Sequence, residues 1–142
     1  MSSLMRNIAS IEYRRFKSVC TNDLKFSVAD NVSVTRSAIN PNSLYHRIEL
    51  YKDRMYDNDI VSTMYVKLEM AYDETTEVNP YNVLIQARIS VVKNYQLRDM
   101  YKRSEDVIFK RAFDAFTPND IGQAINIILG TVDVDCELGP FV

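Results

Sequence analysis

Apolar residues occupy every second position in three stretches of the chain, and this alternation constrains the fold more than any other feature. The clearest stretch contains Val83, Ile85, Ala87, Ile89 and Val91, separated by Leu84, Gln86, Arg88 and Ser90. Residues 43–52 and 61–71 show the same pattern. Because the side chains of a β-strand point alternately to opposite faces, each stretch predicts a strand with one apolar face and one wet or partly covered face.

The connections between these stretches are polar and carry no helical pattern. Residues 53–59 predict a polar loop, and residues 71–82 predict a turn rich in Asp, Glu, Asn and Pro. Successive alternating strands joined in this way are typical of an antiparallel sheet, arranged as a meander or a Greek key.

Three further segments complete the first half of the chain. Residues 24–28 alternate Leu24 and Phe26 with polar neighbours and predict a half-buried strand. Residues 32–43 predict mostly loop, with room for an edge strand. Residues 11–19 fit either a strand or a short amphipathic helix, and the pattern leaves both open.

The last third of the chain changes to the helical period of 3.6 residues. One predicted helix begins at Ser104, and its apolar side contains Ile108, Phe109, Ala112, Phe113 and Phe116. A second has Thr117 as its N-cap and Pro118 in its first turn, and Gly130 is placed to end it. Its apolar side contains Ile121, Ala124, Ile125 and Ile128. Residues 131–142 predict an extended tail or edge strand.

These elements predict an α+β fold in which an antiparallel sheet of about four strands is covered on one face by C-terminal helices. The chain has 142 residues, of which 46% are hydrophobic, so residues 1–142 are expected to form a single domain. A net charge of −2 with scattered Lys and Arg disfavours nucleic-acid binding. The absence of a long apolar run and of a signal-peptide core predicts no membrane contact and a cytoplasmic location.

The residues that usually carry chemistry are sparse. Cys20 and Cys136 belong to no CxxC motif, which argues against a disulfide scaffold or a thiolate zinc site. His46 is the only histidine and shares the apolar alternating face, so we expect a packed, hydrogen-bonded side chain. The acidic alternation of Asp133, Asp135 and Glu137 is more typical of a solvated face than of a metal site. No nucleotide, hydrolase or metalloprotease motif is present, so the sequence predicts a protein that is not an enzyme and has no cofactor.

Tyrosine content suggests binding to other proteins instead. Tyr45, Tyr51 and Tyr65 all fall on the polar faces of their predicted strands. Large amphipathic rings in such positions favour contact with another surface. A protein–protein interface follows as the hypothesis, and a homo-oligomer formed through the sheet is its simplest form.

Two segments carry a family resemblance. The first contains Thr21, Asp23, Leu24 and Phe26 in a Thr-x-Asp-apolar-x-Phe pattern, and the second contains Phe116, Pro118 and Asn119 at the start of a helix. Together with the central strands between them and Leu138 and Pro140 after them, these segments make the chain similar to the SecB export-chaperone family. The resemblance covers about residues 11–142.

The resemblance implies a four-stranded antiparallel sheet with helices on one side, assembled into dimers and tetramers. It implies an ATP-independent chaperone that holds unfolded polypeptides in extended form; some family relatives serve toxin–antitoxin pairs. SecB proteins are usually strongly acidic where they dock the motor SecA, and a net charge of −2 disfavours SecA docking here. The candidate partner-binding residues are Asp23, Tyr45, Tyr51, Tyr65, Phe109, Phe113 and Phe116. The alternative is a structural or assembly protein, viral or phage, that self-associates through its sheet.

Overall fold

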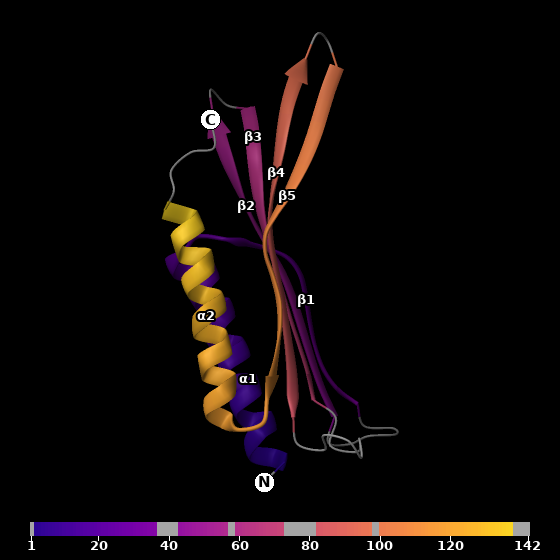
Figure 1. Cartoon of the computed structure of the whole chain (residues 1–142), viewed down its shortest axis with the longest axis vertical. Coiled ribbons are helices and arrows are strands. Elements are labelled where there is room, and N and C mark those ends of the chain that lie inside the picture. Colours follow the sequence, from indigo (N-terminus) through magenta and orange to yellow (C-terminus); the bar gives the residue numbers. More distant parts are fainter. Residues whose placement is uncertain (1, 37–42, 57–58, 73–81, 98–99, 138–142) are drawn as a thin grey trace.

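The protein consists of one antiparallel sheet and two helices (Figure 1). The structure, a computed structural model, describes residues 2–36, 43–56, 59–72, 82–97 and 100–137. In chain order the elements are α1 (Ser2–Ser18), the π-helical turn η1 (Val19–Asp23), β1 (Ser27–Arg36), β2 (Ser43–Tyr56), β3 (Asp59–Tyr72), β4 (Val83–Leu97), β5 (Met100–Ala115) and α2 (Pro118–Glu137).

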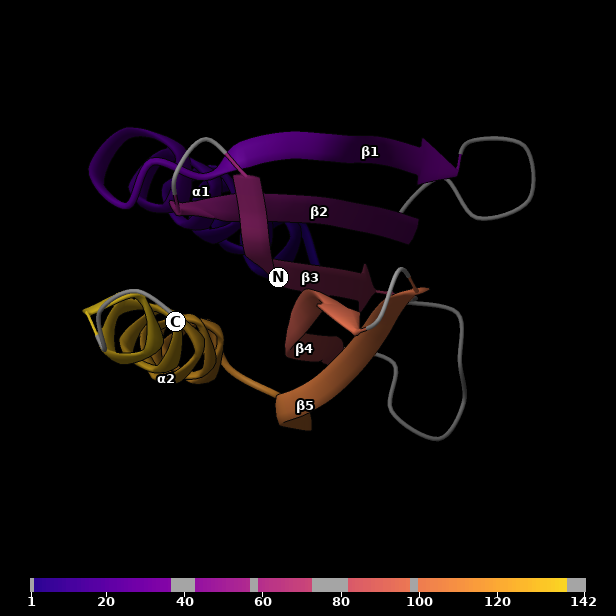
Figure 2. The same ribbon diagram turned by 90° about the horizontal axis from the view of Figure 1, so that it is seen from above.

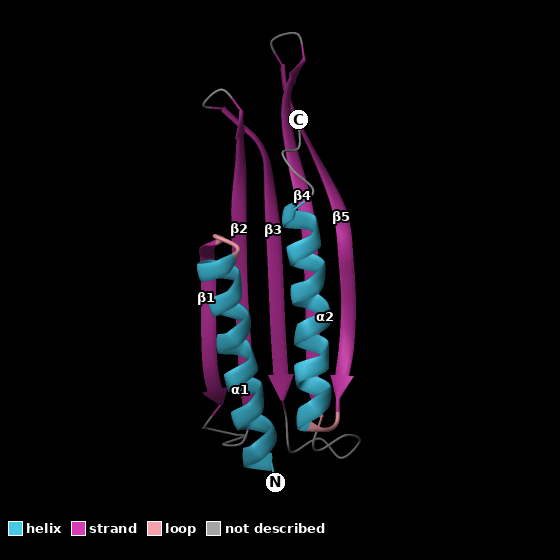
Figure 3. Ribbon diagram, turned by 90° about the vertical axis from the view of Figure 1, so that its left-hand side faces the viewer, coloured by secondary structure: helices cyan, strands magenta, loops and turns pink. Residues whose placement is uncertain are grey.

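The sheet is a simple meander. Its strands follow the order β1-β2-β3-β4-β5, and every neighbouring pair is antiparallel. The helices and the sheet form two layers, with both helices on the same side of the sheet (Figures 1 and 2). Side by side, α1 covers the β1–β3 half and α2 covers the β4–β5 half (Figure 3). The predicted α+β fold with an antiparallel sheet is confirmed, with five strands in place of about four.

The hydrophobic core fills the space between these two layers. Each of β2, β3 and β4 contributes the apolar side of its alternation, including the fully buried Ile48, Leu68 and Ile89. From the other layer, Phe16 of α1 and Ile125 of α2 are also fully buried. The three strands predicted from alternation are therefore confirmed, and each extends a few residues beyond its predicted end.

The open question about residues 11–19 is answered by α1, which includes most of them. Its buried residues are Met5, Ala9, Tyr13, Phe16 and, in η1, Cys20. They recur at spacings of three and four residues, as expected of a helix with one side against a core. One half of the cover over the sheet therefore comes from the N-terminal helix α1, in addition to the predicted C-terminal helix α2.

The predicted helix at residues 104–116 was wrong, because this segment forms most of β5. A β-bulge causes the difference: β4 residues Ile89 and Ser90 face Phe109 and Val107, which leaves Ile108 as the extra residue. The bulge shifts the alternation by one position, so the apolar residues fall at spacings that imitate a helix. Pairing with the long strand β4 outweighs this local pattern.

Two smaller predictions are corrected as well. The strand expected at residues 24–28 starts only at Ser27, because Lys25 adopts a left-handed conformation (φ 64°) that turns the chain from η1 into β1. Residues 131–137, expected to be extended, continue α2 past Gly130. Val132 is fully buried and extends the apolar side of the helix. The predicted start of α2 is confirmed: the Asp120 carboxylate accepts bonds from the N–H groups of Phe116 and Thr117, each at 3.0 Å.

Candidate functional site

The side of the sheet that faces away from both helices is the main candidate for a binding surface, and we call it the open face. It carries the polar side of each strand's alternation. Its central residues are Tyr45, Arg47, Glu49 and Tyr51 of β2, Tyr65, Lys67 and Glu69 of β3, Gln86, Arg88, Ser90 and Val92 of β4, and Arg103, Glu105, Lys110 and Ala112 of β5. Strand register alone places them together, because directly opposed residues of antiparallel strands share a face.

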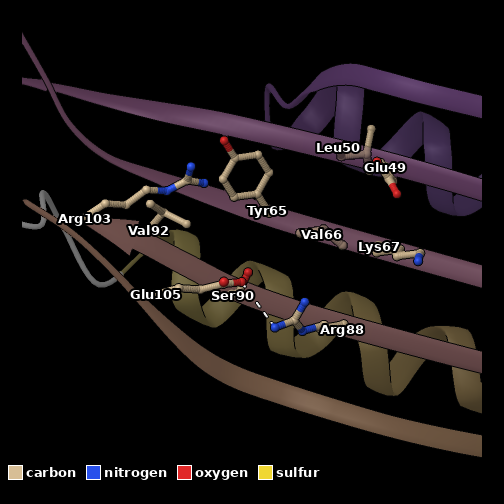
Figure 4. A pocket seen from close by; sticks show the side chains of 10 residues that line it. All are labelled: Glu49, Leu50, Tyr65, Val66, Lys67, Arg88, Ser90, Val92, Arg103 and Glu105. Carbon is tan, nitrogen blue, oxygen red and sulfur yellow. Dashed lines mark ion pairs between the residues drawn. The ribbon is translucent and has the colours of Figure 1, made fainter. Parts of the chain in front are cut away.

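Two adjoining depressions hollow this surface. The first has a volume of about 220 Å³ and is lined by Glu49, Leu50, Tyr65, Val66, Lys67, Arg88, Ser90, Val92, Arg103 and Glu105 (Figure 4). The second has a volume of about 480 Å³ and is lined by Lys67, Glu69, Gln86, Ala87, Arg88, Lys110, Arg111 and Ala112. Lys67 and Arg88, which lie opposite each other on β3 and β4, line both depressions, so the two hollows adjoin at these side chains; we call the pair of depressions the trough.

Ion pairs order the charged side chains of the open face. The Arg88 guanidinium lies 3.3 Å from the Glu105 carboxylate across β4 and β5, as the dashed line in Figure 4 marks. Lys67 and Glu69 approach to 2.9 Å on β3. The hydrogen bond from Lys67 holds the pKa of Glu69 below its ordinary value. Lys67 and Arg88 of the trough are therefore each paired with a carboxylate, and the surface presents charges of both signs.

Tyrosine rings form the apolar part of the same surface. Tyr51 lies directly opposite Tyr65 in the β2–β3 register, and Tyr65 lies opposite Ser90 of β4. Tyr65 is 39% exposed, whereas Tyr45 and Tyr51 are half-buried. The Tyr45 hydroxyl donates to the Glu69 carboxylate at 3.0 Å. Burial, followed by this contact with Glu69, raises the pKa of Tyr45. The predicted placement of the three tyrosines on the polar strand faces is confirmed.

The other predicted binding residues do not join them. Phe109 and Phe113 lie on β5 and pack against the core on the helix-covered side. Phe116 is 54% exposed at the junction between β5 and α2. Asp23 is exposed at the end of η1, on the chain segment that leads into β1. The structure therefore gathers the tyrosines on one surface and separates the remaining candidates from it.

His46 lies on the helix-covered side of β2 and is 6% exposed. Its Nδ1 is 2.6 Å from the Ser33 hydroxyl and its Nε2 is 3.3 Å from the Ser10 hydroxyl. Its ring stacks on Tyr13, with 4.4 Å between the ring centroids. Burial, and secondarily the charge of Arg14, lowers the pKa of His46 to about 4. His46 is thus the packed, hydrogen-bonded histidine that the sequence predicts, held neutral between α1 and β1.

Several residues of the trough were missed at the level of sequence. Arg103 and Glu105 were overlooked because their segment carries a helical pattern that the bulge in β5 produces. Arg88 and Lys67 had a usable signal, since alternation already placed them on the wet faces of β4 and β3. The hollow itself has no sequence signature, because it depends on how neighbouring strands bring side chains of different lengths together.

Comparisons with known proteins leave the family open: no family model, no curated protein and no solved structure matches the chain. Within the described ranges, no three His, Cys, Asp or Glu side chains gather in a way that could hold a metal ion. The helices in the same part of the chain are too short or too polar to span a membrane. The trough is therefore judged by its own geometry.

Proposed function

We propose that this protein binds unfolded or partner polypeptides in extended form on its open face, as an ATP-independent cytoplasmic chaperone similar to SecB, of the export or toxin–antitoxin type. The observation that carries the proposal is the trough, two adjoining depressions lined from four strands that combine the Tyr65 ring with side chains of both charges. An extended peptide that lies over Lys67 and Arg88 would contact both depressions.

The chemistry of the trough suits a client of variable sequence. Tyr65 offers an exposed ring for apolar side chains, and the aliphatic stems of Lys67 and Arg88 add further apolar area beneath their charged ends. Polar groups of both signs can satisfy peptide N–H and C=O groups. Contacts of this kind give modest affinity with little dependence on sequence, as a chaperone that must also release its client requires.

The family resemblance supports the same proposal. In the described chain, a run of antiparallel strands is followed by a long helix that begins at the Phe116-x-Pro118-Asn119 segment, the order of elements that the resemblance implies. The five strands and the N-terminal helix α1 differ from the four-stranded architecture implied for the family. The open face is common to both arrangements, and it is the part on which the proposed activity depends.

A structural or assembly protein is the second candidate. The ion pairs of the open face favour it, since Arg47–Asp30, Lys67–Glu69 and Arg88–Glu105 present a fixed charge pattern that a single complementary partner could match. The two candidates differ in their measurable behaviour. A chaperone captures many unfolded chains as a small oligomer of fixed size, whereas an assembly protein grows with concentration.

Binding of a permanently unfolded protein, carboxymethylated α-lactalbumin, tests the proposal. We expect Tyr65→Ala to weaken binding by about tenfold, because an exposed aromatic ring at the centre of an interface contributes roughly 1–2 kcal/mol. Phe116→Ala is the matched control: it removes an aromatic ring of greater exposure outside the trough and should leave affinity unchanged. Binding that is absent in the unmodified protein, or lost equally in both variants, would show that the open face is not the client site.

A further inference from the structure

The free edge of β5 carries a charge pattern that fits a second copy of itself. β5 is the last strand of the sheet and is 16 residues long, and the sheet order gives it one neighbour, β4. The backbone groups on its outer side are therefore available to another strand. Along the strand the charged residues are Lys102, Arg103, Glu105, Asp106, Lys110, Arg111 and Asp114.

The signs of these charges reverse about the middle of the strand. From Arg103 to Asp114 the charges are positive, negative, negative, then positive, positive, negative, and Lys102 adds a positive charge before them. When two copies of such a strand lie antiparallel, the first half of each faces the second half of the other, so opposite charges meet. Charged edge strands usually prevent pairing because like charges oppose one another. Because the signs reverse along β5, two antiparallel copies of this strand attract each other instead.

The bulge at Ile108 determines which register is consistent with the strand faces. Suppose that Phe109 of one copy lies opposite Phe109 of the other, and that the bulge residues Val107 and Ile108 together occupy one position. Counting outward from Phe109 then places Asp106 opposite Arg111 and Arg103 opposite Asp114. The two-fold axis doubles each contact, giving about four ion pairs across the edge.

The faces agree in this register. Asp106 and Arg111 pair with Val91 and Ala87 of β4, which both point to the helix-covered side. Asp114 pairs with Leu84, on the open side of β4, and Arg103 lies two residues before Glu105, which pairs with Val92 on that same side. In each pair the opposing side chains therefore project from the same surface of the sheet, as cross-strand ion pairs require.

Apolar side chains occupy the centre of the same edge. Val107 is 47% exposed and Ile108 is 42% exposed, and both lie next to the proposed two-fold axis. At the opposite edge of the sheet, β1 has 10 residues and contains one acid and one base, Asp30 and Arg36, and Asp30 is already 2.7 Å from Arg47 of β2. Charge complementarity and exposed apolar area both favour β5.

We propose that two copies of this chain pair antiparallel along their β5 edges, with Phe109 on the two-fold axis, to form a continuous ten-stranded sheet. The open faces of the two copies then lie on the same side, so the two troughs adjoin across the new interface. The proposal concerns the edge of the sheet and is independent of whether the open face binds unfolded polypeptides.

Charge reversal with rescue tests the proposal by sedimentation velocity. The unmodified protein should sediment as a dimer, at twice the chain mass of 16.4 kDa. Asp106→Arg and Arg111→Asp should each weaken dimerisation by about tenfold, because each replaces two attractive cross-strand pairs with two repulsive ones at a few tenths of a kcal/mol apiece. The double variant should restore the dimer, since the exchanged charges again face opposite charges.

The rescue distinguishes contact between copies from contact within one chain. Residues 106 and 111 are separated by about 16 Å along a single strand, too far for them to pair with each other. Asp133→Arg, at an exposed acid of α2, is the control for the change in net charge and should leave the dimer intact. Circular dichroism verifies that each variant folds. A monomeric unmodified protein, or a dimer that survives both single reversals, overturns the proposal without bearing on polypeptide capture.

Discussion

His46 illustrates how the surroundings of a side chain decide its role. As the only histidine of the sequence it is an obvious candidate for acid–base chemistry. In the fold it lies between α1 and β1, with both ring nitrogens near serine hydroxyls and one ring face against Tyr13. Burial lowers its pKa to about 4, so the imidazole is neutral near pH 7. Its contribution is to the packing of α1 on the sheet.

This lowered pKa predicts a loss of stability in acid. The unfolded chain binds a proton at His46 near pH 6.5, whereas the folded protein does so only near pH 4. The contribution of neutral His46 to the free energy of unfolding is therefore complete above pH 6.5 and is lost as the pH falls towards 4. We expect protonation of His46 between pH 6.5 and pH 4 to lower the free energy of unfolding by about 2 kcal/mol. This is less than the full value that the shift in pKa implies, because nearby solvent screens part of the effect.

Urea unfolding as a function of pH measures that loss. His46→Gln keeps a hydrogen-bonding side chain at the site but cannot titrate in this range. Its stability should be lower than that of the unmodified protein at neutral pH and should vary less between pH 6.5 and pH 4. The same slope in both proteins would show that other groups cause the acid sensitivity.

Helix α2 offers a matched test of how the helices are held on the sheet. Ile128 is fully buried, whereas the adjacent Ile127 is 43% exposed on the outer side of the helix. We expect Ile128→Ala to lower the unfolding free energy by about 3 kcal/mol through lost burial and the cavity left behind. Ile127→Ala should change it by less than about 0.5 kcal/mol. Equal effects in thermal and urea unfolding would contradict the packing of α2 described above.

The secondary structure could be predicted from the sequence wherever a single period continued without interruption. The alternation in β2, β3 and β4 spans whole strands, and the cap at Thr117 marks the start of α2. The pattern failed where the period was broken. The bulge at Ile108 made β5 resemble a helix, and the alternation of Val132 and Val134 concealed the last turns of α2. In both cases contacts with distant residues outweighed local sequence.

The binding surface could be predicted only in part for the same reason. Alternation assigns Tyr45, Tyr51 and Tyr65 to the wet sides of their strands, and register then brings them to one face. The trough also requires Arg103 and Glu105 from β5, whose conformation the sequence pattern did not reveal. Which face stays open is decided by the whole molecule, because α1 and α2, from opposite ends of the chain, both pack on the other side.

At the scale of the whole fold, the two-layer arrangement separates the core from the open face. The core lies between the helices and the sheet, so side chains of the open face can vary in response to a partner without loss of core packing. Pairing of two copies along β5 would double the area of that face without covering it. We therefore expect partners to bind on the side of the sheet away from the helices.

Site-specific photo-crosslinking tests this expectation. A benzophenone side chain is placed at Tyr65 on the open face or, in a separate variant, at Ile127 on the outer side of α2, two positions of similar exposure. Each variant is irradiated with carboxymethylated α-lactalbumin. We predict a crosslinked product from position 65 and none from position 127. Crosslinking from position 127 alone, or from neither position under conditions where binding is measured, would contradict the open face as the binding surface.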